Sequence, residues 1–294
     1  MNRPIVVYIN KAKVIIYPMT NVRSVQIVTN IKCGSWHENE KNRGYFHFLE
    51  HMLFHGTKKF PSSEKMMAFA KDNGIYSNAS TSGKGINHYL QVPDINFDKG
   101  LKAFEETIFY PIFPKNKIKN EISVVTQEIK SKWDRPETRF FNQNDKLIFG
   151  ENHVFTQDPL GNIKTLEKIN VNILKKLHQQ YFQPQNMIIT IVGNIGNKNI
   201  LIDKLNKILQ KHPNNFLSKF TPPLINPSST KTLVYHDKPE QETISLIWIL
   251  RNKRKPTREQ KIFQRLFSNI IGDSIDSFLF KIFRLKYGLV YNIR

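Results

Sequence analysis

The residues best suited to chemistry are two histidines and a glutamate within five positions, His47-Phe48-Leu49-Glu50-His51. Histidines at i and i+4 lie on one face of a helix, so both imidazoles can reach the same metal ion. Glu50 lies beside that face, where its carboxylate can hydrogen-bond a metal-bound water. The alternative is an amphipathic helix with two incidental histidines. A hydrolytic zinc site would also need a third protein ligand.

A long helix, predicted from Pro114 to about residue 133, offers carboxylates for that third position. Glu121 and Glu128 are seven residues apart and therefore lie two turns apart on the same helix face. A buried carboxylate is costly without a partner, and a metal ion is a suitable one. The alternative is a pair of solvated glutamates. The apolar neighbours that favour burial are Ile118, Ile122, Val125 and Ile129.

The segment from Gly44 to Thr57 resembles the zinc helix of the pitrilysin/insulinase metallopeptidases, which include the mitochondrial processing peptidases. Their His-x-x-Glu-His order reverses the His-Glu-x-x-His order of other zinc peptidases. Between His51 and Glu128 lie 76 residues, which is the spacing of the third-ligand glutamate in that family. Glu121 occupies the place of a supporting glutamate seven positions earlier.

The resemblance implies a role for each of these residues. His47, His51 and Glu128 would bind one zinc ion, and Glu50 would be the base that activates water. Glu121 would assist catalysis as a supporting carboxylate that holds His47 or His51.

Other segments are similar to the same family. Asn78-Ala79-Ser80-Thr81 resembles its edge strand, which pairs with the substrate backbone, and Asp158-Pro159-Leu160-Gly161 resembles its Pro-Leu-Gly loop. Arg284 and Tyr291, seven apart, match an arginine and a tyrosine that contact substrate in the family. The implied substrate-binding residues are Asn78, Ala79, Arg284 and Tyr291.

Alternation with period two predicts strands, and apolar spacing of three and four predicts helices. The predicted strands cover residues 5–17, 25–31, 77–82, 88–92, 187–192, 243–250 and 289–293. The predicted helices cover residues 41–55, 62–72, 97–109, 114–133, 136–149, 171–182, 198–211, 257–271 and 275–285.

The resemblance implies an α+β fold made of two-layer α/β sandwich domains, the second one incomplete. The predicted boundaries are 1–216 for the catalytic domain, 217–230 for a Pro- and Ser-rich linker and 231–294 for the first part of a second, homologous domain. Family domains of this kind continue past the segment that contains Tyr291, so we expect a truncated sequence.

Composition limits the remaining classes of protein. The chain has 294 residues and a formal net charge of +20. Its longest apolar runs are far shorter than the roughly 20 residues that span a bilayer, so no membrane association is expected. A lone cysteine, Cys33, excludes an intramolecular disulfide and a Cys-rich zinc ribbon. The N-terminus lacks the features of a signal peptide, which favours the cytoplasm.

The predicted function is hydrolysis of peptides or unfolded segments by a zinc endopeptidase. Because two similar halves close the active chamber in the family, the chain would form a homodimer or pair with a sister subunit. One alternative is a non-catalytic structural or assembly subunit that pairs with an active sister chain. The other is a nucleic-acid binder, but the basic residues are scattered and no nucleic-acid partner is expected. Five histidines that lack ligand-spaced partners are expected to have no functional role: His37, His55, His88, His153 and His178.

Overall fold

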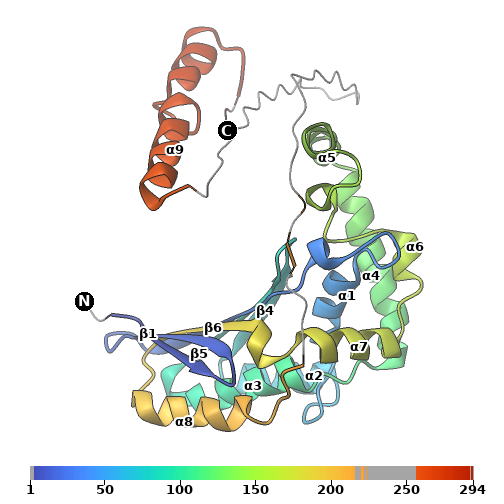
Figure 1. The fold of residues 1–294 in the computed structure, drawn as a ribbon, viewed down its shortest axis with the longest axis vertical. Helices are drawn as coiled ribbons and strands as arrows, with labels where there is room; N and C mark the ends of the chain where they lie inside the picture. Colours follow the sequence, from blue (N-terminus) through green and yellow to red (C-terminus); the bar gives the residue numbers. More distant parts are fainter. Residues whose placement is uncertain (1–2, 216–219, 222, 224–255, 292, 294) are drawn as a thin grey trace. The chain divides into compact units, whose positions relative to one another are not determined.

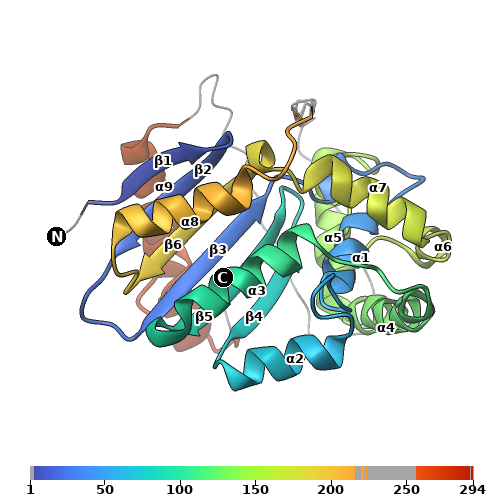
Figure 2. The ribbon, with the colours of Figure 1, turned by 90° about the horizontal axis from the view of Figure 1, so that it is seen from below.

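The computed structural model describes residues 3–215, 220–221, 223, 256–291 and 293. It divides into two compact units, residues 1–240 and 241–294. The first unit is built on a six-stranded sheet with the order β1-β2-β6-β3-β5-β4 (Figures 1 and 2). Only the β2–β6 pair is parallel, and the other neighbouring strands are antiparallel. The strands are β1 (Ile5–Ile9), β2 (Ala12–Pro18), β3 (Ser24–Ile31), β4 (Tyr76–Thr81), β5 (Ile86–Pro93) and β6 (Met187–Gly193).

Helices cover one face of this sheet. Along β3, Val25, Ile27 and Ile31 are buried, whereas Gln26 on the opposite face is exposed. This alternation is typical of a sheet with one face on the core. Two helices, α3 (Phe97–Phe109) and α8 (Lys198–Leu209), lie on the buried face (Figure 2). The predicted two-layer α+β architecture is therefore confirmed.

A second group of helices lies beside the β4 edge (Figure 1). Helix α1 packs against β4, α4 and α7. The group comprises α1 (Tyr45–Met52), α4 (Lys115–Trp133), α5 (Pro136–Phe149), α6 (Ile163–Leu166) and α7 (Val171–Tyr181). Helix α2 (Ser63–Asp72) leads into β4.

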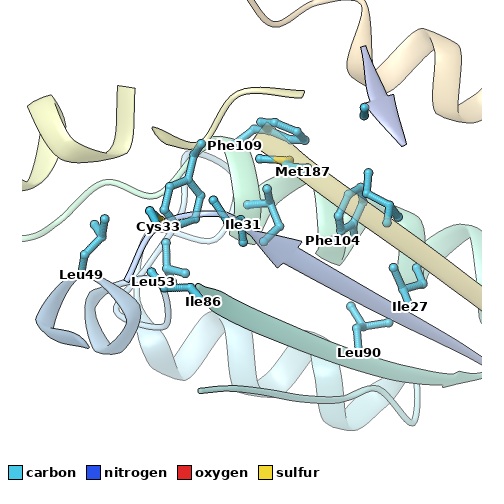
Figure 3. Close-up of a cluster of buried hydrophobic side chains, with 14 of the residues drawn as sticks. Ile27, Ile31, Cys33, Leu49, Leu53, Ile86, Leu90, Phe104, Phe109 and Met187 are labelled. Atoms are coloured by element: carbon cyan, nitrogen blue, oxygen red, sulfur yellow. The ribbon is translucent and has the colours of Figure 1, made fainter. Parts of the chain in front are cut away.

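A continuous apolar core ties α1 to the sheet. One buried cluster joins the sheet and the helices (Figure 3). It contains Ile31 of β3, Ile86 of β5, Phe104 of α3, Leu49 of α1 and Leu53, which directly follows α1. All five side chains are fully buried. Helix α1 is therefore fixed relative to β3 and β5 by close packing.

Two predicted elements of the first unit differ most from the structure. The predicted strand 5–17 is a hairpin of β1 and β2, because Asn10 and Lys11 form a turn with φ of +45° and +66°. Positive φ at both central residues is typical of the tight turns that match strand twist. The predicted helix 41–55 spans only Tyr45–Met52.

The second unit is described over part of its length. Helix α9 (Arg258–Ile271) has the predicted extent, with Thr257 as its N-cap. A π-helical segment, Phe280–Lys286, replaces most of the predicted helix 275–285. The predicted strand 289–293 is wrong over its described residues, which form no ladder. The predicted strand 243–250 and most of the predicted linker 217–230 lie outside the described residues.

A buried carboxylate caps the N-terminus of α1. Glu38 is 5% exposed, and its two oxygens accept the backbone N–H groups of Gly44 and Phe46, each at 2.8 Å. These N–H groups have no partner within the helix, and an anion also favours the positive end of the helix dipole. Burial nevertheless raises the pKa of Glu38 to about 7.

The Glu38 carboxyl should make stability depend on pH. Its folded-state pKa lies above its ordinary value of 4.5, so the folded chain binds this proton more tightly than the unfolded chain between those values. The stabilisation by this bound proton is complete below about pH 4.5 and is lost as the pH rises through about 7. We expect wild type to lose up to about 3 kcal/mol of unfolding free energy relative to Glu38→Gln between pH 4.5 and 8.

Chemical denaturation of both proteins at several pH values measures this difference. Effects of pH on groups that the Glu38 charge does not influence are common to the two proteins and cancel. A difference in stability that stays constant over the whole range would contradict the prediction.

Candidate metal centre

Helix α1 presents His47 and His51 one turn apart on the same face. The Nε2 atoms of the two rings are 3.3 Å from each other. Burial, followed by the neighbouring charge of His51, lowers the pKa of His47 to about 3. His47 is therefore the neutral imidazole that metals bind.

The Pro-Leu-Gly loop holds the N-terminus of α1 in place. Gly44 and Gly161 are in backbone contact, and a Cβ on Gly161 would lie 2.4 Å from the Gly44 Cα. Both glycines also have positive φ, +86° and +76°, so a side chain at either position would be strained. In the same loop, Asp158 pairs with Lys132 of α4 at 2.8 Å. The loop thus connects the start of α1 to α4.

Glu128 of α4 completes a three-residue cluster. Its Oε2 lies 3.8 Å from Nε2 of His47 and 3.7 Å from Nε2 of His51. One ligand atom from each residue lies within 4.8 Å of the others. Bonds of about 2.0–2.1 Å to a tetrahedral zinc ion place ligand atoms about 3.3 Å apart, so this donor set fits zinc. The exposed Glu128 leaves an open side on the cluster.

Glu121 lies beside the cluster and contacts His51, one of its two histidines. Its Oε1 is 2.7 Å from Nδ1 of His51, and its Oε2 is 2.7 Å from Nε2 of His55. Hydrogen bonds from His51 and then His55 lower the pKa of Glu121 to about 2. The ionised carboxylate can only accept, so Nδ1 of His51 carries a proton and Nε2 is the ring nitrogen that faces His47 and Glu128.

Glu50 projects from the same helix and is 7% exposed. The hydroxyl of Thr81 on β4 donates to its Oε2 at 2.8 Å. Burial raises the pKa of Glu50, and the Thr81 hydrogen bond opposes that rise. A desolvated carboxylate with a raised pKa is suited to act as a general base.

These side chains line a cavity of about 620 Å³. Its walls come from α1, from α4, from residues 78–81 of β4 and from Pro159 and Leu160. The two predicted substrate-binding residues of this unit, Asn78 and Ala79, therefore lie in the same cavity as the metal cluster. Because β4 is an edge strand, one of its sides is open to further pairing.

Arg284 and Tyr291 belong to the second unit. The Arg284 guanidinium lies 4.5 Å from the centre of the Tyr291 ring, and its Nη1 donates to the Val290 carbonyl at 3.2 Å. The two residues are thus in contact with each other, and their substrate-binding role stays a prediction.

Three residues that the sequence analysis did not assign to the site support it in the structure. Glu38 caps α1, Thr81 holds Glu50, and His55 shares Glu121 with His51. His55 was expected to have no functional role; it follows His51 by four residues, lies beyond the end of α1 at Met52, and contacts Glu121 without belonging to the metal-ligand cluster. That spacing was visible in the sequence. No spacing or motif in the sequence indicated that Glu38 would accept the N–H groups of Gly44 and Phe46.

Two family models match the chain. "Insulinase (Peptidase family M16)" matches residues 13–157, which contain the whole metal cluster. "Peptidase M16 inactive domain" matches residues 168–294. The second match begins within the first unit, before β6, which pairs with β2 and β3.

The curated relatives are longer proteins. The "Uncharacterized zinc protease YmxG" of Bacillus subtilis is 29% identical over 285 residues, which cover 97% of this chain and 67% of that protein. This chain therefore spans about two-thirds of that relative.

Solved structures support the fold. A protease from Helicobacter pylori has a TM-score of 0.78 at 21% identity and covers 99% of this chain and 70% of its own. The first half of the periplasmic protease PqqL from Escherichia coli has a TM-score of 0.68 at 24% identity, over 75% of this chain and 48% of its own. Since that neighbour is periplasmic, a cytoplasmic location for this chain stays a prediction. Within the described residues, no helix is both long and apolar enough to cross a bilayer.

The family matches, the zinc-protease relative and the shared fold agree with the motif around His47. The chain belongs to the insulinase family of peptidases, M16.

Proposed function

We propose that this chain is a zinc-dependent endopeptidase. The observation that carries the proposal is the cluster of His47, His51 and Glu128, whose ligand atoms lie within 4.8 Å of one another beside Glu50. Three protein ligands with an open side are the arrangement of catalytic zinc, whereas structural zinc is closed by four. One zinc ion per chain would occupy the cluster.

When bound, zinc lowers the pKa of a coordinated water and polarises the carbonyl of the scissile peptide. Glu50 takes a proton from the attacking water and delivers it to the leaving amine. Thr81 holds one carboxylate oxygen of Glu50, which leaves the other oxygen for that proton. Glu121 keeps His51 in the tautomer and orientation that bind the metal.

Extended peptides are the substrates that this cavity favours. The Ala79 N–H donates to Oδ1 of its neighbour Asn78 at 2.8 Å. In an antiparallel pair, alternate residues direct their N–H groups away from the partner strand, and this bond is consistent with an Ala79 N–H on the free side of β4. A substrate strand could replace Asn78 as the acceptor and extend the sheet beside the metal.

A second subunit would complete the chamber. We propose a homodimer or a pair with a sister subunit, because the family likeness implies a chamber with two similar halves. In such an assembly Arg284 and Tyr291 would contact substrate in their own or the partner's site. Sedimentation of the purified chain, alone and with candidate sister chains, tests the assembly.

Replacing Glu50 should separate metal binding from catalysis. We expect Glu50→Gln to bind one zinc ion per chain, as wild type does, because Glu50 is outside the ligand cluster. Cleavage of a quenched fluorescent peptide should fall by about 10²–10⁴-fold, since the amide cannot accept the proton. Zinc-loaded Glu50→Gln that cleaves as fast as wild type would refute the mechanism. Zinc-loaded wild type without cleavage would favour the alternative of a non-catalytic subunit.

Replacing Glu128 should remove a metal ligand. We expect Glu128→Gln to weaken zinc binding by more than the roughly 10–100-fold that changes in a ligand's hydrogen-bond partner cost. Titration against a chelating dye measures the dissociation constant. The matched control is Glu167→Gln, an exposed glutamate at the end of α6, which should bind zinc like wild type. Equal affinities for both variants would exclude Glu128 as the third ligand.

Blocking the free edge of β4 should affect substrate binding alone. Ala79→Pro removes the N–H, and proline is tolerated where an edge strand faces outward. We expect KM for an extended peptide to rise by about 3–10-fold, the worth of one hydrogen bond, with an unchanged zinc dissociation constant. Ala79→Gly keeps the N–H and should retain a KM near that of wild type. If both variants raise KM equally, β4 does not bind substrate through this group.

A further inference from the structure

His55 makes its strongest contact with a residue that itself supports the metal centre. It follows the end of α1 at Met52, and its backbone N–H donates to the Met52 carbonyl at 3.4 Å. Its ring nitrogen Nε2 lies 2.7 Å from Oε2 of Glu121. The side chains of His55 and Glu121 are 20% and 10% exposed, so water competes little for this hydrogen bond.

The two oxygens of Glu121 are divided between two imidazoles. Oε1 faces Nδ1 of His51 and Oε2 faces Nε2 of His55, both at 2.7 Å. A glutamate side chain has three rotatable bonds, and a single hydrogen bond leaves its carboxylate free to turn. Two hydrogen bonds on opposite oxygens fix the carboxylate plane and therefore the direction in which Oε1 accepts.

His55 is not suited to bind the metal itself. Its Nε2 is engaged by Glu121, and the ligand set formed by the described residues contains His47, His51 and Glu128 without it. Its Nδ1 is buried and has no hydrogen-bond partner. Any influence of His55 on the metal must therefore pass through Glu121.

We propose that His55 is a positioning residue for the metal centre, which holds Glu121 in the orientation that directs Nε2 of His51 toward zinc. This inference rests on the proposed function only in that the cluster binds zinc. It extends the support of the metal from one carboxylate to a chain of three side chains, His55–Glu121–His51. Such outer partners of metal-binding histidines typically change metal affinity by about 10–100-fold.

The test is the zinc dissociation constant of the full chain, measured by competition with a chelating dye. We expect His55→Leu to weaken zinc binding about tenfold, because leucine fills similar space but cannot donate to Glu121. His55→Gln should bind zinc within about threefold of wild type, since its side-chain amide keeps a donor for Glu121. A purely structural role of the ring would not separate these two variants in this way.

His212→Leu is the matched control. His212 is another half-buried histidine, and its ring stacks on Phe109 at 3.8 Å between ring centres. The change should affect stability and leave the zinc dissociation constant unaltered. A loss of zinc in this variant equal to that in His55→Leu would overturn the inference.

A double-mutant cycle tests whether His55 acts through Glu121. Glu121→Ala removes the shared acceptor, so adding His55→Leu to it should weaken zinc binding by less than about twofold more. Full additivity of the two changes would overturn the inference. So would a wild-type affinity in His55→Leu, or equal losses in the Leu and Gln variants.

These outcomes separate the inference from the proposed function. A wild-type chain that binds no zinc would overturn both. A wild type that binds zinc without cleaving peptides would overturn the peptidase alone, because the readout for His55 is metal affinity.

Discussion

The metal centre depends on bringing side chains from two helices to within a few ångströms of one point. Helix α1 supplies His47 and His51 by its own periodicity, but Glu128 arrives only when α1 packs against α4. Several contacts fix that packing: the buried Leu49 and Leu53 below, the contact between Gly44 and Gly161 at the start of the helix, and the Glu38 cap. The precision of a metal site rests on such supporting contacts, because ligand positions are useful only within about half an ångström.

Charge in the cavity favours a cation. The chain carries a formal net charge of +20, yet the cavity gathers the carboxylates of Glu50, Glu121 and Glu128 beside Lys132. Carboxylates that share one site repel one another, and a divalent ion bound among them offsets that repulsion. The basic composition therefore says little about the site, whose local charge has the opposite sign.

Local signals in the sequence predicted much of the fold and of the cluster. The bounds of α3 and α5 agree with the prediction, since proline marks their borders, and the i, i+4 spacing placed His47 and His51 together. The hairpin at Asn10 and Lys11 was missed because its turn has no glycine, although both residues adopt positive φ. Contacts between residues far apart in the sequence could not be predicted from local patterns. Examples are the contact of Glu121 with His51 rather than His47, and the hydrogen bond from Thr81 of β4 to Glu50. Those contacts depend on how α1 packs between β4 and α4. The residue roles carried over from the family remain predictions.

The most direct measurement of the central claim is a crystal structure of the purified chain with anomalous diffraction at the zinc edge. The account predicts one anomalous peak per chain, about 2.0–2.2 Å from Nε2 of His47, Nε2 of His51 and a carboxylate oxygen of Glu128. Zinc bound at other residues, or a cluster that stays without metal in excess zinc, would contradict it.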